Sequence, residues 1–147
     1  MRIGRIERAW AAESLRPAVG WKVWRVEDGQ LVSVLYGDPW PADEPIRARC
    51  VRHAHEAPST SCECGIHAGR ELEAWEHYLR VGVESRVFGR VLLWGSTVEG
   101  SHGWRAACAR PVEIVVPAAV ERAEEVADAL RAYAVPVHAP SREAVPA

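Results

Sequence analysis

Residues 50–68 read CVRHAHEAPSTSCECGIHA, and they hold three of the four cysteines and three of the six histidines of the chain. Thiolate and imidazole are the ligands that zinc prefers, and structural zinc sites take four of them in a tetrahedron. The stretch offers such a set in the spacing Cys50-x2-His53-x8-Cys62-x-Cys64. We therefore predict a closed zinc site with these four ligands, which pins an irregular loop as a structural metal clip.

The spacing leaves other arrangements open, because a Cys-x-Cys pair is tighter than the usual Cys-x2-Cys of zinc fingers. His55 can replace His53 as a ligand, and His67 can either bind the metal or contact one of the ligands without binding the metal. An iron–sulfur cluster is a further alternative, with Cys108 as a fourth thiolate. The remaining alternatives are a redox pair of Cys62 and Cys64, or incidental cysteines beside surface histidines with no site at all.

The residues on either side of the stretch predict the elements that the clip would join. Residues 46–51 alternate in the manner of a strand, which turns Ile46, Ala48 and Cys50 to its apolar face. Residues 65–80 place apolar side chains at helical spacing and predict a helix. The positive end of that helix would lower the pKa of thiols at its start.

The rest of the chain predicts an α+β fold. An Asp-Gly step between residues 21–26 and 31–36 is typical of a hairpin. Gly89 and Gly95 interrupt the long strand-like run 86–98, which indicates bulges and strong curvature. Further predicted elements are strands at 104–108 and 112–116, a helix over 118–133 and a short edge strand near 134–137.

We therefore expect a curved antiparallel sheet, partly barrel-like, with two packing helices and the metal clip. Residues 1–20 are expected to form an N-terminal arm, residues 21–139 a single α+β domain and residues 140–147 a flexible tail.

Composition limits the classes of function. The 147 residues carry a formal net charge of -2, which argues against a protein that mainly binds phosphate backbones. The start of the chain lacks the apolar run of a signal peptide, and no later run approaches the ~20 residues of a membrane span. We expect a cytoplasmic protein that works away from membranes, where thiols stay reduced and can bind metal.

Seven tryptophans stand against one phenylalanine. We interpret them as a tryptophan-rich core, and Trp40, between Pro39 and Pro41, as a lid over it. An exposed aromatic surface for a partner is the alternative.

Outside the cysteine-rich stretch, signals of catalysis are weak. No Gly-x-Ser-x-Gly, phosphate-loop or dinucleotide motif occurs. The sequence therefore favours a zinc-stabilised, non-enzymatic binding or adaptor module whose partner is a protein or a small molecule. One alternative is a thiol- or metal-dependent enzyme acting on a small molecule through His102, His55 or Cys108. Another is a nucleic-acid-associated factor, which would use the arginines at 47, 49 and 52 beside exposed tryptophan.

Four segments carry a resemblance to known sequences: GWKVWRVEDGQLVS (20–33), DPWPADEPIRARC (38–50), CECGIHA (62–68) and GRVLLWGSTVEG…GWRAACARP (89–111). In these segments the chain resembles a group of small, uncharacterised bacterial proteins with a Cys…His…Cys-x-Cys-Gly motif. The resemblance implies the ligand role for Cys50, His53, Cys62 and Cys64, and it implies no activity. The group more often has a histidine and an acidic residue at the places of Gly100 and Ala107, so this chain lacks that pair.

Overall fold

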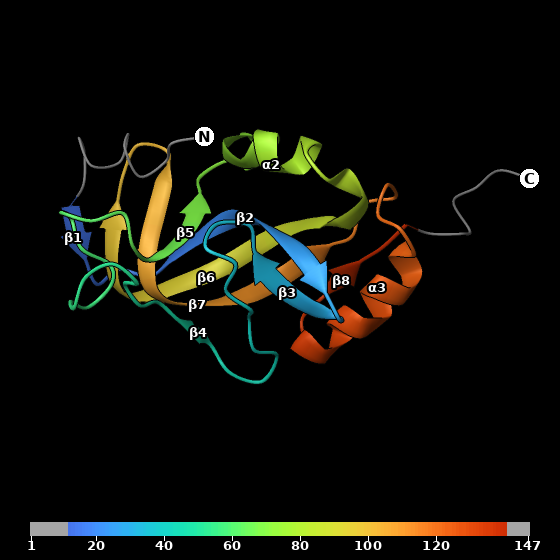
Figure 1. The fold of residues 1–147 in the computed structure, drawn as a ribbon, viewed down its shortest axis with the longest axis horizontal. Helices are drawn as coiled ribbons and strands as arrows, with labels where there is room; N and C mark the ends of the chain where they lie inside the picture. The colour runs from blue at the N-terminus through green and yellow to red at the C-terminus, as the bar shows by residue number, and fades with distance from the viewer. Residues whose placement is uncertain (1–11, 141–147) are drawn as a thin grey trace, which may run out of the picture.

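The computed structural model describes residues 12–140, and two long strands joined as a hairpin form its framework (Figure 1). These strands are β6 (Arg86–Glu99) and β7 (Gly103–Val115). Six shorter strands join them in one sheet: β1 (Ala12–Ser14), β2 (Ala18–Glu27), β3 (Gln30–Ser33), β4 (Ile46–Arg47), β5 (Ile66–Gly69) and β8 (Val137–His138). The helical segments are η1 (Leu72–Trp75), α2 (Glu76–Arg80), η2 (Val83–Ser85), α3 (Ala123–Leu130) and η3 (Arg131–Tyr133).

Four of the strands form a ring. Strand β6 pairs with β7 on one edge and with β2 on the other, and β5 pairs with both β2 and β7. The ring is not a true barrel, because β2 and β5 share the single residue pair Trp21 and Gly69. This arrangement confirms the α+β prediction of a curved, partly barrel-like sheet with packing helices. The sheet is mixed rather than wholly antiparallel, since β8 runs parallel to β7.

The curvature arises where the sequence predicted it. The register between β6 and β7 shifts between Arg90 and Val91 and again between Trp94 and Thr97. Gly95 lies in the second shift with a φ of 79°, which few residues other than glycine adopt. At Gly89 a Cβ atom would lie 2.1 Å from the carbonyl oxygen of Glu113, so only glycine permits this approach of the strands.

Three of the six tryptophans among residues 12–140 lie in the core. Trp24, Trp40 and Trp75 are fully buried, and the rings of Trp24 and Trp40 meet edge to face at 5.4 Å. The indole N–H of Trp40 donates to Ser33 Oγ at 2.7 Å, which satisfies its polar atom. Trp40 is therefore part of the core and contributes almost no surface.

The predicted helix over residues 65–80 is wrong in its first part. Residues 66–69 form strand β5, which is buried throughout and pairs with β7. Helical structure begins only at Leu72. Tertiary pairing overrides the helical spacing here, because Gly65 (φ 119°) turns the chain into the edge of β7.

Other element boundaries also differ from the predictions. The strand predicted over 46–51 ends at Arg47, and the helix predicted over 118–133 begins at Ala123. The later start follows from Arg122, whose φ of 54° is left-handed. The predicted edge strand lies at Val137–His138.

The predicted arm and tail fall partly outside the described residues, which exclude 1–11 and 141–147. Within the described part of the arm, β1 pairs with β6 and β2 begins at Ala18. No helix within residues 12–140 has the length and apolar character needed to cross a bilayer.

The weak junction between β2 and β5 is reinforced by side chains. Lys22, the single lysine of the chain, is 2% exposed and donates from Nζ to the carbonyl oxygen of His67 at 2.7 Å. Its ammonium group lies 4.9 Å from the ring of Trp75 and 5.7 Å from that of Trp40. Burial lowers the pKa of Lys22 to about 7, although the charge of Asp38 opposes this shift.

Lys22 makes stability depend on pH. An unfolded lysine has a pKa of about 10.4, so between pH 7 and pH 10 the unfolded chain binds more protons and the free energy of unfolding rises with pH. Below pH 7 the cost of burying the charge is present in full. We expect Lys22→Met to flatten this rise, by up to about 1.4 kcal/mol per pH unit in urea denaturation. Arg110→Met removes a cation from the surface instead, and an equal flattening in that variant would contradict the assignment.

Candidate metal centre

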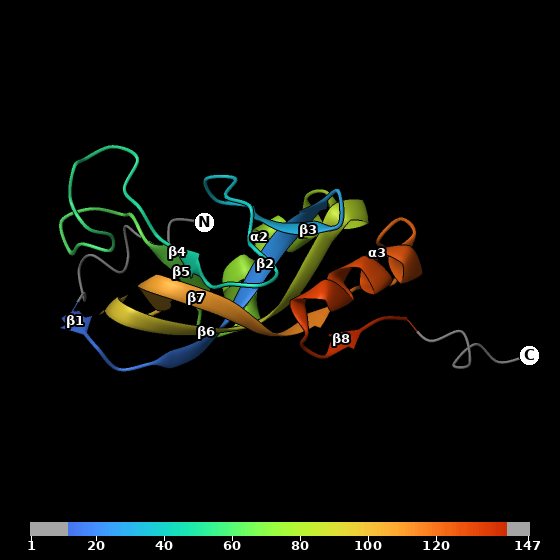
Figure 2. The ribbon, with the colours of Figure 1, turned by 90° about the horizontal axis from the view of Figure 1, so that it is seen from below.

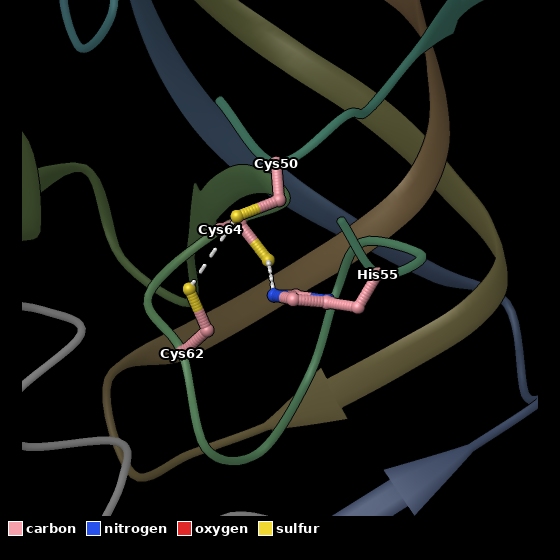
Figure 3. Close-up of side chains that lie close together, drawn as sticks. All are labelled: Cys50, His55, Cys62 and Cys64. Carbon is pink, nitrogen blue, oxygen red and sulfur yellow. Dashed lines mark hydrogen bonds between the residues drawn. The ribbon is translucent and has the colours of Figure 1, made fainter. Parts of the chain in front are cut away.

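Four side chains from the loop between β4 and β5 converge on one point (Figure 3). They are Cys50, His55, Cys62 and Cys64, and their donor atoms all lie within 4.8 Å of one another. The sulfurs of Cys50 and Cys62 are 3.7 Å apart, and Cys64 Sγ is 4.0 Å from His55 Nε2. These residues lie close enough to bind a metal ion.

The cluster lies at one end of the molecule. The segment between β4 and β5 forms a large loop there, and helix α3 packs at the opposite end (Figure 2). Three of the four predicted ligands, Cys50, Cys62 and Cys64, are brought together as expected. The cysteine pair precedes strand β5 and not a helix, so no helix dipole acts on these thiols.

The histidine of the cluster is His55 and not the predicted His53. The His53 ring stacks on that of His55, with centroids 5.8 Å apart, and lies outside the group. His55 Nδ1 lies 2.7 Å from the carbonyl oxygen of Glu56, and a carbonyl can only accept, so Nδ1 carries the proton. The lone pair of Nε2 then faces the thiols. Metal-binding histidines typically have this arrangement.

A buried arginine on strand β7 donates hydrogen bonds to the backbone of the cysteine loop. Arg105 on β7 is fully buried, and one of its guanidinium nitrogens donates to three carbonyl oxygens of the loop. The acceptors are those of Ser59 at 3.1 Å, Cys64 at 2.8 Å and Cys62. The loop packs closely here, since a Cβ on Gly65 would lie 3.0 Å from Arg105 Cβ. The sequence analysis did not identify Arg105. The one feature of the sequence that points to it is the presence of a charged residue within an apolar strand.

The thiols influence one another's protonation. Burial raises the pKa of Cys64 to about 11, and hydrogen bonding to Cys62 adds to this rise. Burial also acts to raise the pKa of Cys62, but hydrogen bonds from the backbone of Cys64 and the thiol of Cys50 outweigh it and lower the pKa. The Cys62 thiol therefore loses its proton more readily than the Cys64 thiol does. A metal ion would have to displace the proton of Cys64.

A small hollow of about 40 Å³ adjoins the three cysteines. Tyr36, Asp38, Arg49 and Arg52 contribute to its lining. Tyr36 is 57% exposed and has a φ of 66°, a left-handed conformation that is rare for a bulky residue. The sharp turn here closes with a hydrogen bond from the backbone of Ser33 to the carbonyl of Asp38. The structure thus presents an exposed aromatic ring and two guanidinium groups beside the cluster.

Other candidate residues lie apart from the cluster. Cys108 is 8% exposed, lies 3.5 Å from the guanidinium of Arg47 and does not join the four donors. His102 is exposed in the turn between β6 and β7. His67 is buried, and burial together with the charges of Lys22 and Arg105 lowers its pKa to about 3, so its ring is neutral.

The arginines of the nucleic-acid alternative are exposed at residues 47, 49 and 52. That alternative also needs exposed tryptophan. Each of the six tryptophans among residues 12–140 is buried or half-buried. Comparison of the chain with protein-family models, with curated proteins and with solved structures finds no match.

Substitution of Arg105 tests what its hydrogen bonds contribute to stability. A lysine side chain is shorter than that of arginine and ends in a compact ammonium group. We therefore expect Arg105→Lys to leave some of the three carbonyls without a donor. Unfilled buried acceptors should lower the free energy of unfolding by about 2–4 kcal/mol, as measured by urea denaturation. Arg110→Lys, an exposed change on the same strand, should cost less than about 0.5 kcal/mol. Equal effects of the two substitutions would refute the role of Arg105.

Proposed function

We propose that this protein is a zinc-stabilised, non-enzymatic binding or adaptor module in which Cys50, His55, Cys62 and Cys64 hold one zinc ion. The distance between the sulfurs of Cys50 and Cys62 carries the proposal. Zinc–sulfur bonds of about 2.3 Å in a tetrahedron set two ligand sulfurs about 3.8 Å apart. The two sulfurs are 3.7 Å apart.

The compactness of the cluster favours a single ion over an iron–sulfur cluster. An iron–sulfur cluster places several iron and sulfide atoms between its cysteines, which holds their sulfurs well apart. Here all four donor atoms lie within 4.8 Å of one another. Cys108, which that alternative needs as a fourth thiolate, is not among them. Three thiolates and one imidazole are a typical ligand set of structural zinc.

Four protein ligands leave no open position for water or substrate, so such an ion has a structural role and not a catalytic one. It would join the segment after β4 to the segment before β5. Its chemistry is limited to crosslinking the loop, while Arg105 positions the backbone that carries Cys62 and Cys64. The proposal includes a cytoplasmic location, because thiols stay reduced there.

The binding surface in this proposal is the hollow beside the cluster. A zinc ion with three thiolates carries a formal charge of about -1. Arg49 and Arg52 line the same hollow as these cysteines, so the negative charge of the zinc site would partly balance the positive charge of the two guanidinium groups. This balance supports a protein or small-molecule ligand at Tyr36 and its neighbours more than a nucleic acid.

Zinc content tests the first part of the proposal. Purified protein is expected to carry one zinc per chain by elemental analysis and to be colourless, since zinc has no d–d absorption. Cys62→Ala should lose the zinc and lower the free energy of unfolding, whereas Cys108→Ala should keep the zinc. A zinc-free protein whose stability is unchanged by Cys62→Ala would refute the proposal.

The two histidines provide a matched pair of variants. Because His55 Nε2 faces the thiols and His53 lies outside the group, we expect His55→Ala to weaken zinc binding at least tenfold. His53→Ala should change the affinity little. Competition with a chromophoric chelator measures both, and the reverse order of effects would assign the ligand role to His53.

A further inference from the structure

Cys50 and Cys62 differ from Cys64 in their access to solvent. All three cysteines line the hollow, but Cys50 and Cys62 are half-buried, whereas Cys64 is 8% exposed. The sulfurs of Cys50 and Cys62 are also 3.7 Å apart. We propose that Cys50 and Cys62 form a redox modification site, at which a hydroperoxide converts them to a disulfide that takes the place of the metal ion. The displacement of the metal ion rests on the proposed function.

The backbone at both cysteines leaves room for the bond. A disulfide needs a sulfur–sulfur distance of about 2.05 Å, so the sulfurs must approach by less than 2 Å. Cys50 lies three residues beyond the end of β4, and Cys62 lies four residues before the start of β5. Neither residue is held in a strand register, so side-chain rotation at both cysteines and a small backbone shift at Cys50 can bring the sulfurs together.

The geometry also explains why Cys64 is spared. Cys64 lies two residues before β5, closer to the strand than Cys62, and its thiol faces His55. Its buried sulfur is the least accessible of the three to an oxidant in solution. Only Glu63 separates it from Cys62, so a disulfide between those two would close a very small ring.

The reaction balances as a two-electron oxidation. One of the two sulfurs attacks the peroxide oxygen, the O–O bond breaks, and a sulfenic acid forms as water leaves. The other sulfur attacks the sulfenic sulfur, forms the S–S bond and releases a second molecule of water. Two thiolates, hydrogen peroxide and two protons thus give a disulfide and two waters. His55 and Cys64 alone cannot retain the metal ion, which departs.

The disulfide would join the same two segments that the metal joins. Arg105 holds the backbone of Ser59, Cys62 and Cys64 without help from the ion. Oxidation is therefore expected to release the metal while the sheet stays folded, and reduction with added zinc should restore the original site.

Hydrogen peroxide added to the purified, zinc-loaded full chain tests the inference. We expect release of one zinc per chain, detected with a chromophoric chelator, and a mass loss of about 2 Da for the two hydrogens. A protease that cleaves after glutamate would cut at Glu56 and Glu63, which separates Cys50, Cys62 and Cys64 into different peptides. The peptides of Cys50 and Cys62 should be linked. Cys64→Ala should still form this link, and Cys62→Ala should not.

Several results would overturn the inference. They are a link to Cys64, a sulfinic acid on a single cysteine, or zinc retained in excess peroxide. Loss of the sheet's circular dichroism on oxidation would contradict the exchange of one crosslink for the other. If the purified chain holds no zinc, the proposed function fails, but the peptide map of the same sample still decides whether Cys50 and Cys62 pair.

Discussion

The candidate metal centre depends on the buried guanidinium of Arg105. A guanidinium nitrogen can only donate hydrogen bonds, and in the protein interior it needs acceptors. One nitrogen of this side chain donates to three backbone carbonyls of the cysteine loop. Drawing the carbonyls of Cys62 and Cys64 toward β7 leaves their side chains free to turn toward Cys50 and His55. The position of the donor cluster is therefore tied to strand β7, which carries Arg105.

The ring of strands depends in a similar way on side chains that connect backbones. Strands β2 and β5 share one residue pair, yet Lys22 donates to a carbonyl of β5, and Trp75 donates from its indole nitrogen to Trp21 at 2.8 Å. The two buried tryptophans beside Lys22 provide π-faces that favour a cation, which offsets part of the cost of its burial. The junction with the fewest ladder bonds thus contains the most unusual polar group of the core.

What the sequence predicts correctly is local or depends on residue type. The hairpin at Asp28 and Gly29 and the bulge at Gly95 follow from backbone preferences within a few residues. The convergence of the three cysteines agrees with an expectation drawn from ligand chemistry. The presence of His55 rather than His53 in the group depends on the path of a loop that spacing does not define. Strand β5 and the burial of Arg105 arise from partners far along the chain, which helical periodicity and charge patterns cannot reveal.

The location of the only lysine has a consequence for the surface. Seventeen of the eighteen basic side chains are arginines, and the one ε-amine is enclosed between Trp40 and Trp75. Modification of a lysine side chain, by acetylation or ubiquitin transfer for example, requires an exposed ε-amine, and the folded chain offers none. Guanidinium groups also keep their charge at any pH that a protein tolerates. Guanidinium groups thus take the place that lysines have on most protein surfaces, while the single ε-amine of the chain is held inside.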